Sequence, residues 1–69
     1  MRISARNVLK GIVKQITVGA VNDEVVIDLG HGVEVVSVIT KKSADSLGLA
    51  VGKTAYAIVK ASNVMVGVD

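Results

Sequence analysis

Ser4 and Arg6, near the start of this 69-residue chain, form a pair of side chains suited to binding a small oxyanion. They are two residues apart, so in an extended chain they point the same way. A hydroxyl and a guanidinium on one side of the chain supply a directed donor and a positive charge, which a tightly held anion requires. Asn7 follows, and we expect it to lock the turn into the first strand and so to aim Arg6.

Two other stretches carry the same kind of chemistry. Thr40 and Ser43 lie where a predicted strand ends and a predicted helix begins, so their hydroxyls lie beside N–H groups without a helical partner. Lys60, Ala61 and Ser62 lie where a later strand breaks, so that their amides can turn away from a ladder. Each stretch also has an ordinary structural explanation, as a helix cap, a turn or a solvated chain end. Spacing alone leaves open whether the three stretches meet.

Groups suited to catalysis or to direct metal ligation are few. His31 lies between two glycines at a predicted hairpin tip, with no serine or cysteine placed beside it as a nucleophile. The six carboxylates are scattered over predicted turns and strand exteriors, and no cysteine is present. A disulfide framework and a thiolate metal site are therefore excluded, and one histidine cannot build a usual zinc site. We expect no enzyme activity, no cofactor and no metal ion ligated directly by protein atoms.

Length and composition favour a small β-rich domain that needs partner subunits. The chain forms at most one domain, residues 1–69, and it buries too small a fraction of its surface to be comfortable as a lone monomer. Hydrophobic residues make up 51% of the chain and are nearly all Val, Ile, Ala and Leu, which predicts a small, branched, β-prone core.

Charge and aromatic content bear on the kind of partner. A formal net charge of +2 mildly favours anionic partners. Tyr56 is the only aromatic residue, so stacking platforms for bases are missing and we expect no nucleic-acid partner. No apolar run approaches the length of a membrane span, and the N-terminus lacks the apolar segment of a signal peptide. We therefore expect a cytoplasmic protein that makes no membrane contact.

Branched residues and turn signals define the expected elements. Glycines on both sides of His31 predict a hairpin there, and the polar segment after Thr40 predicts one short helix that ends before Gly48. Strands are expected at residues 9–18, 24–30, 33–40, 54–60 and 64–68. Five strands with a short helix after the third predict an all-β fold, a small five-stranded Greek-key barrel of the OB type.

Three segments of the chain resemble the molbindins, the small cytoplasmic molybdate-binding proteins of the Mop family. They are ISARNVLKG at residues 3–11, SVITKKSADSLGL at 37–49 and VKASNVMVGV at 59–68. The resemblance covers essentially the whole chain in the family's order and spacing. Similar sequence occurs as a domain in molybdate-responsive regulators and transporter ATPases. This chain has one copy of the motif and neither a helix-turn-helix nor an ATPase segment, so it resembles the free-standing binder.

The resemblance implies an OB-type barrel, a hexamer built as a trimer of dimers, and molybdate or tungstate bound between subunits. The family's dimer-interface site falls on Ser4, Arg6, Thr40, Ser43, Lys60, Ala61 and Ser62, with Thr40 and Ser43 contributed by the other subunit. A second type of site lies near the threefold axis, and its candidates are Lys10, Asn22 and His31.

The function implied is the binding and storage, or buffering, of molybdate or tungstate in the cytoplasm for cofactor synthesis. The chief alternative is a structural or regulatory interaction module whose barrel edges dock a partner protein, with any anion binding incidental. A third interpretation is an OB-like binder of nucleic acid.

Overall fold

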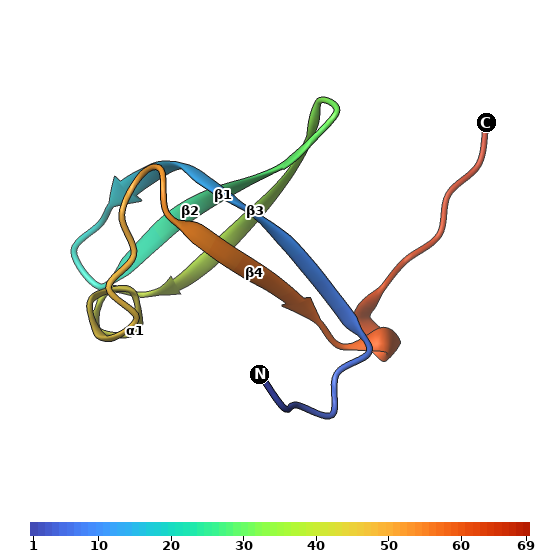
Figure 1. Ribbon diagram of the computed structural model, residues 1–69, viewed down its shortest axis with the longest axis horizontal. Helices are drawn as coiled ribbons and strands as arrows, with labels where there is room; N and C mark the ends of the chain where they lie inside the picture. Colours follow the sequence, from blue (N-terminus) through green and yellow to red (C-terminus); the bar gives the residue numbers. More distant parts are fainter.

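The computed structural model describes all 69 residues and has a single antiparallel sheet with one short α-helix. The all-β fold with one short helix is therefore confirmed. In chain order the elements are β1 (Asn7–Val18), β2 (Asn22–Gly30), β3 (Val33–Thr40), α1 (Lys41–Ser46), β4 (Thr54–Val59) and a 3-10 turn, η1 (Ala61–Asn63). The strand order is β3-β2-β1-β4, so β3 and β4 are the edges of the sheet. The sheet curls, and β4 crosses over the β2–β3 hairpin (Figure 1).

β1 is long enough to pair with two neighbours. Its first half, from Asn7 to Ile12, pairs with β4, and its second half pairs with β2. The register shifts between Val13 and Gln15, which is a β-bulge, and bulges bend a strand and increase its twist. Gly11 lies two residues before the bulge and is buried, and a side chain there would meet the backbone of Asp28. The strand can therefore curl around the core.

The turns follow the residue types expected of them. The β2–β3 hairpin turns through Gly30, His31 and Gly32, all with positive φ, a conformation that glycine adopts at no steric cost. Thr40 caps α1, because its hydroxyl oxygen accepts a hydrogen bond from the Ser43 amide at 3.1 Å. The helix ends at Ser46, and Gly48, two residues later, has a φ of +64°.

The hydrophobic core of the chain is small. Seven of the 69 residues are buried, and the centre of the core is formed by Val13 and Val25, each 1% exposed, with Ile27 and Ala57. Many large apolar side chains, among them Val36, remain on the surface. None of the helices is long and apolar enough to cross a membrane.

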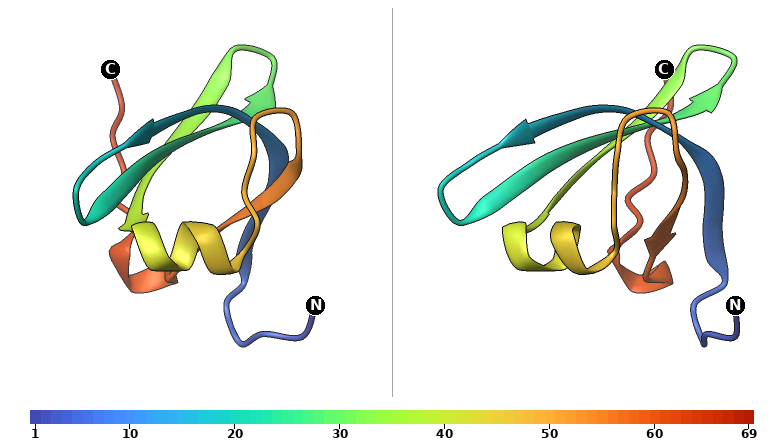
Figure 2. Two further views of the ribbon diagram at one scale, coloured as in Figure 1. Left: turned by 90° about the vertical axis from the view of Figure 1, so that its left-hand side faces the viewer. Right: turned by 60° about the vertical axis from the view of Figure 1, so that its left-hand side comes forward.

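The fifth strand expected at residues 64–68 is not found, because four strands make up the sheet. Beyond η1 the chain is extended at Val64, but it joins no ladder. The turn is closed by hydrogen bonds from the Asn63 amide to the Lys60 carbonyl at 2.9 Å and from the Val64 amide to the Ala61 carbonyl at 3.2 Å. This turn sends the C-terminal segment away from the sheet (Figures 1 and 2). The sheet of one chain is therefore open between β3 and β4.

Candidate oxyanion-binding site

The first and third oxyanion-binding stretches meet where β1 begins and β4 ends. Asn7 and Val59 are directly paired across the two strands. The residues that precede Asn7 and those that follow Val59 therefore leave the sheet at the same end. This single register brings Arg6 and Lys60, which are far apart in the sequence, to neighbouring positions.

One cavity is shared by these two stretches. It has a volume of about 620 Å³, opens to solvent, and is lined by Ser4, Ala5, Arg6, Ile58, Lys60, Ala61 and Ser62. Five of the seven residues expected at the dimer-interface site thus lie around one space in a single chain. All of these residues but the half-buried Ala5 are exposed, so one chain supplies a wall rather than an enclosed pocket.

Asn7 fixes the geometry of this wall. Its side-chain amide nitrogen donates a hydrogen bond to the Val59 carbonyl at 3.2 Å. The first residue of β1 is therefore bonded to the last residue of β4. The sequence predicted that Asn7 locks the turn into the first strand, whereas in the structure its side chain bonds across to the end of β4. The bond joins the two chain segments that border the cavity lined by Arg6 and Lys60.

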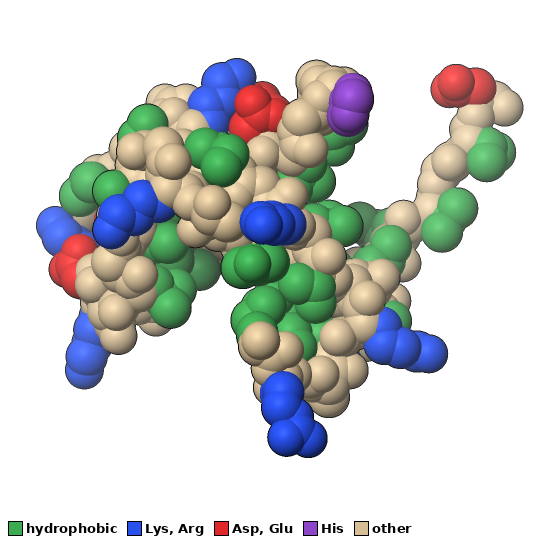
Figure 3. Space-filling model, viewed as in Figure 1, with side chains coloured by type: hydrophobic (Ala, Val, Ile, Leu, Met, Phe, Trp, Pro, Cys, Tyr) green, Lys and Arg blue, Asp and Glu red, His purple; other side chains and the backbone are tan.

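The cavity carries positive charge that no carboxylate neutralises. The one ion pair of the chain joins Lys14 to Glu34, so neither Arg6 nor Lys60 is in a salt bridge. Figure 3 shows basic and no acidic side chains around the end of the molecule where the N-terminal arm and the end of β4 meet. The two backbone hydrogen bonds of η1 are donated by the amides of Asn63 and Val64. The amides of Ala61 and Ser62 donate neither of these bonds. Two cations, two hydroxyls and two amides therefore border one cavity.

Thr40 and Ser43 line no part of this cavity. In the single chain their hydroxyls bond to each other at 2.8 Å, in addition to the cap of α1. Ser43 borders a separate depression on the outer face of α1. The structure of one chain therefore gives this stretch the role of a helix cap.

The candidates for the second type of site are not brought together either. Lys10 borders a depression between β1 and the end of β2, whereas Asn22 begins β2 and His31 lies at the hairpin tip. Asn22 is paired across the sheet with Thr40, which places it beside the helix cap. No group of three or more His, Cys, Asp or Glu side chains is arranged to hold a metal ion.

Two residues of the cavity were missed by sequence reasoning. Ala5 lies between Ser4 and Arg6 in the sequence, is half-buried and lines the same cavity. Ile58 lies in β4 two residues before Lys60, and the alternation of a strand puts both on one side. That alternation was the signal that could have identified Ile58.

The chain is similar to several known proteins. Residues 3–66 match the family model of the TOBE domain. The chain is 52% identical over 69 residues to a probable molybdenum-pterin-binding protein of Haemophilus influenzae, and the match covers 100% of both chains. Two longer curated relatives, the molybdenum-pterin-binding protein MopA of Rhodobacter capsulatus and the molybdenum transport protein ModE of Azotobacter vinelandii, are 53% and 51% identical, and the chain spans 24% of the length of each.

Two solved structures are also similar. MopII from Clostridium pasteurianum superposes with a TM-score of 0.91 at 39% identity, over 97% of this chain and 100% of that one. The cytoplasmic molybdate-binding protein ModG, solved with molybdate bound, gives a TM-score of 0.93 at 51% identity, over 100% of this chain and 49% of that one.

The chain therefore belongs to the TOBE domain family. Within it, the likeness over the full length is to the molybdenum-pterin-binding Mop proteins, so the resemblance seen in the sequence is confirmed.

Proposed function

We propose that this protein binds molybdate or tungstate and stores or buffers the ion in the cytoplasm, in pockets between subunits of an oligomer. The observation that carries the proposal is the single cavity that joins Ser4 and Arg6 to Lys60, Ala61 and Ser62. Family membership supports it, since structural relatives include proteins described as molybdate-binding.

The donor set suits a tetrahedral dianion held through its oxygens. Burying such an ion is costly unless charges and directed donors replace its hydration. Arg6 and Lys60 supply two positive charges, and the hydroxyls of Ser4 and Ser62 together with the amides after Lys60 orient the oxygens. In this proposal no protein atom ligates molybdenum, the protein needs no cofactor, and it carries out no reaction.

The open cavity calls for a second wall. We assign it to Thr40 and Ser43 of a second copy, whose hydroxyls lie exposed at the start of α1. The small core and the many exposed apolar side chains support assembly, and the proposed state is a hexamer, built as a trimer of dimers. Lys10, Asn22 and His31 lie apart within one chain, so the second type of site is proposed to form only when subunits meet near the threefold axis. Each assembled subunit is an OB-type barrel of five strands.

The test of this proposal is isothermal titration with sodium molybdate, using sodium chloride at equal ionic strength as the control. We expect saturable heat from molybdate at several sites per oligomer and none from chloride. The absence of saturable heat from molybdate and from tungstate would contradict the proposal.

An interaction module that docks another protein is the alternative that a structural feature favours. Residues 64–68 and the uncovered edges of β3 and β4 present apolar surface that a partner protein could cover. This alternative predicts no heat with molybdate in the same titration.

A further inference from the structure

The side chains that line the candidate oxyanion cavity offer many hydrogen-bond donors and few acceptors. Arg6 and Lys60 can only donate, because a guanidinium and an ammonium group have no acceptor site. The hydroxyls of Ser4 and Ser62 can accept, but a hydroxyl that accepts a proton from a bound ion turns its own proton away from that ion. No carboxylate lines the cavity. A proton carried by a bound oxyanion therefore has no dedicated acceptor among these side chains.

The backbone carbonyls at the end of β4 are already engaged. The carbonyl of Val59 accepts the hydrogen bond from the Asn7 side chain at 3.2 Å. The next two carbonyls, those of Lys60 and Ala61, accept the bonds that close η1, at 2.9 and 3.2 Å. In contrast, the amides of Ala61 and Ser62 donate neither of these two bonds. This side of the cavity thus has three occupied acceptors beside two amide donors that take no part in closing η1.

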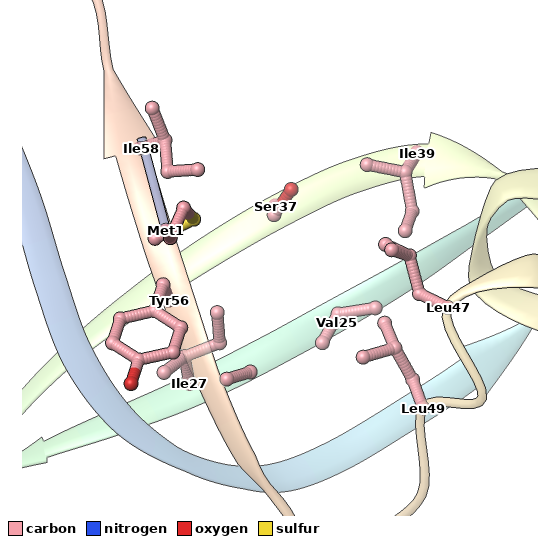
Figure 4. A pocket seen from close by; sticks show the side chains of 10 residues that line it. Met1, Val25, Ile27, Ser37, Ile39, Leu47, Leu49, Tyr56 and Ile58 are labelled. Atoms are coloured by element: carbon pink, nitrogen blue, oxygen red, sulfur yellow. The ribbon is translucent and has the colours of Figure 1, made fainter. Parts of the chain in front are cut away.

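Ile58 makes one flank of the cavity apolar. The same side chain also lines a second cavity, of about 280 Å³, whose walls include Ile27, Ile39 and Leu49 (Figure 4). An O–H group directed at this flank would meet hydrocarbon instead of an acceptor. A buried donor without an acceptor is costly, because it has given up its hydrogen bond to water and gained none.

The wall that the proposed function takes from a second copy has the same character. The depression that Ser43 borders on α1 is otherwise lined by Lys42, Ser46 and Leu47. It contains a cation and hydroxyls, and again no carboxylate. A pocket closed by these two walls would surround its ion with cations and donors.

We propose that this site selects oxyanions by protonation state: it admits tetrahedral dianions that carry no proton and rejects those that carry one, such as hydrogen phosphate and hydrogen arsenate. The inference rests on the proposed anion site and names the class of ion that the site admits. A protonated ion is disfavoured because its O–H group lacks an acceptor and because the oxygen that carries the proton is a poor partner for the donors. Molybdate, tungstate, sulfate and selenate carry no proton at neutral pH, whereas phosphate and arsenate keep at least one.

Competition between ions of nearly equal size tests the selection. Selenate and arsenate form one such pair, and sulfate and phosphate form another. At mildly alkaline pH all four are dianions, so the members of a pair differ chiefly by the proton. Each ion is added as its sodium salt, at equal ionic strength, before isothermal titration with sodium molybdate. We expect half displacement of molybdate to need about 10–100 times more arsenate than selenate, the range for one buried donor left without an acceptor.

Titration with molybdate alone separates this inference from the proposed function. Saturable heat without a competitor supports the anion site, whatever the competing ions do. Equal displacement by selenate and arsenate, including none by either, would then overturn the selection while leaving the site. The absence of molybdate heat would contradict the site and the selection together.

A carboxylate placed in the cavity should weaken the preference. Ala5→Asp adds an acceptor to the lining, and its negative charge repels both dianions alike, so the measured quantity is the ratio of arsenate to selenate needed for half displacement. We expect this ratio to fall about 10-fold relative to wild type. Ala5→Val, the matched control, adds bulk without an acceptor and should keep the wild-type ratio. Circular dichroism checks that both variants fold. A folded Ala5→Asp protein with an unchanged ratio would contradict the part assigned to the missing acceptor.

Discussion

At the scale of single residues, the cavity depends on two cations that make no ion pair. Arg6 and Lys60 are free to meet an anion because the carboxylates of the chain lie elsewhere, and one of those carboxylates, Glu34, already holds Lys14. In a proposed pocket closed by a second subunit, such cations replace the hydration that a dianion gives up. The unpaired cations of the proposed binding end are therefore distinct from the exposed ion pair of Lys14 with Glu34.

Arg6→Ala should weaken molybdate binding by about 2–5 kcal/mol, the range for losing one partner of a buried charge-assisted contact. Isothermal titration measures the change. Arg2→Ala is the matched control, because Arg2 is exposed in the same N-terminal arm and lines no cavity. Wild-type affinity in Arg6→Ala would remove Arg6 from the site.

The ion pair of Lys14 with Glu34 should contribute little to stability. The hydrogen bond to Glu34, followed by its charge, raises the pKa of Lys14 above 10.5. Whatever stability this provides is present below pH 10.5 and is lost as the pH rises through the raised pKa. Both side chains are largely solvated, so Lys14→Met should leave the melting temperature at pH 7 nearly unchanged. A large drop in the melting temperature would show that this pair is structural.

At the scale of elements, local signals predicted the strands and the helix well. Branched residues and the glycines around His31 identified β2 and β3, and the Thr40 hydroxyl with Gly48 bounded α1. The boundaries moved by up to two residues, because strand ends depend on ladder partners. Residues 64–68 have the composition of a strand, but a strand also needs a neighbour to pair with. Local preference could not reveal that the chain itself supplies none.

The meeting of the first and third stretches could not be predicted from the sequence alone. Each stretch was identified by its residue types, but their proximity follows from the pairing of Asn7 with Val59, 52 residues apart. Residue types do not specify such long-range register. The same limit explains why the sequence could not show that Thr40 and Ser43, although their hydroxyls suit an anion, lie outside the cavity of one chain.

The bend of β1 gives a prediction for Gly11. A side chain at this position would place Cβ 2.5 Å from the Asp28 carbonyl oxygen and 2.7 Å from the Ile27 side chain. Gly11→Val should therefore lower the free energy of unfolding by about 1–3 kcal/mol, as overpacking does. Urea unfolding at fixed protein concentration measures it. Thr17→Val, at an exposed position of the same strand, is the control and should differ little from wild type. Equal midpoints for the two variants would show that the strand can move to accept a side chain.

At the scale of the whole molecule, a single chain lacks an extensive core, a closed sheet and an enclosed anion site. The core cluster has four buried residues, the sheet is open between its edges, and the proposed anion site has one wall. Assembly would complete all three. Ligand that binds between subunits stabilises the assembled state by mass action.

Molybdate should therefore raise both the melting temperature and the resistance of the oligomer to dilution. At a free concentration about 100 times the Kd, a single site adds about 2.7 kcal/mol to the stability of the bound state. Thermal unfolding and sedimentation velocity, each with sodium chloride at equal ionic strength as the control, measure the two effects. Unchanged melting and unchanged sedimentation with molybdate would count against a site shared between subunits.

The pairing of β1 with β4 also sets the order in which the chain acquires the cavity proposed to bind the anion. β1, β2 and β3 are joined by short connections, so their hairpins close small loops. The Asn7–Val59 contact closes a loop of about 50 residues, and non-local contacts of this kind are slow to form. We expect the meander to fold first and the oxyanion cavity to appear only with the last pairing step. A nascent or partly folded chain would then have no anion site to fill, and molybdate would bind only to chains that have completed their folding.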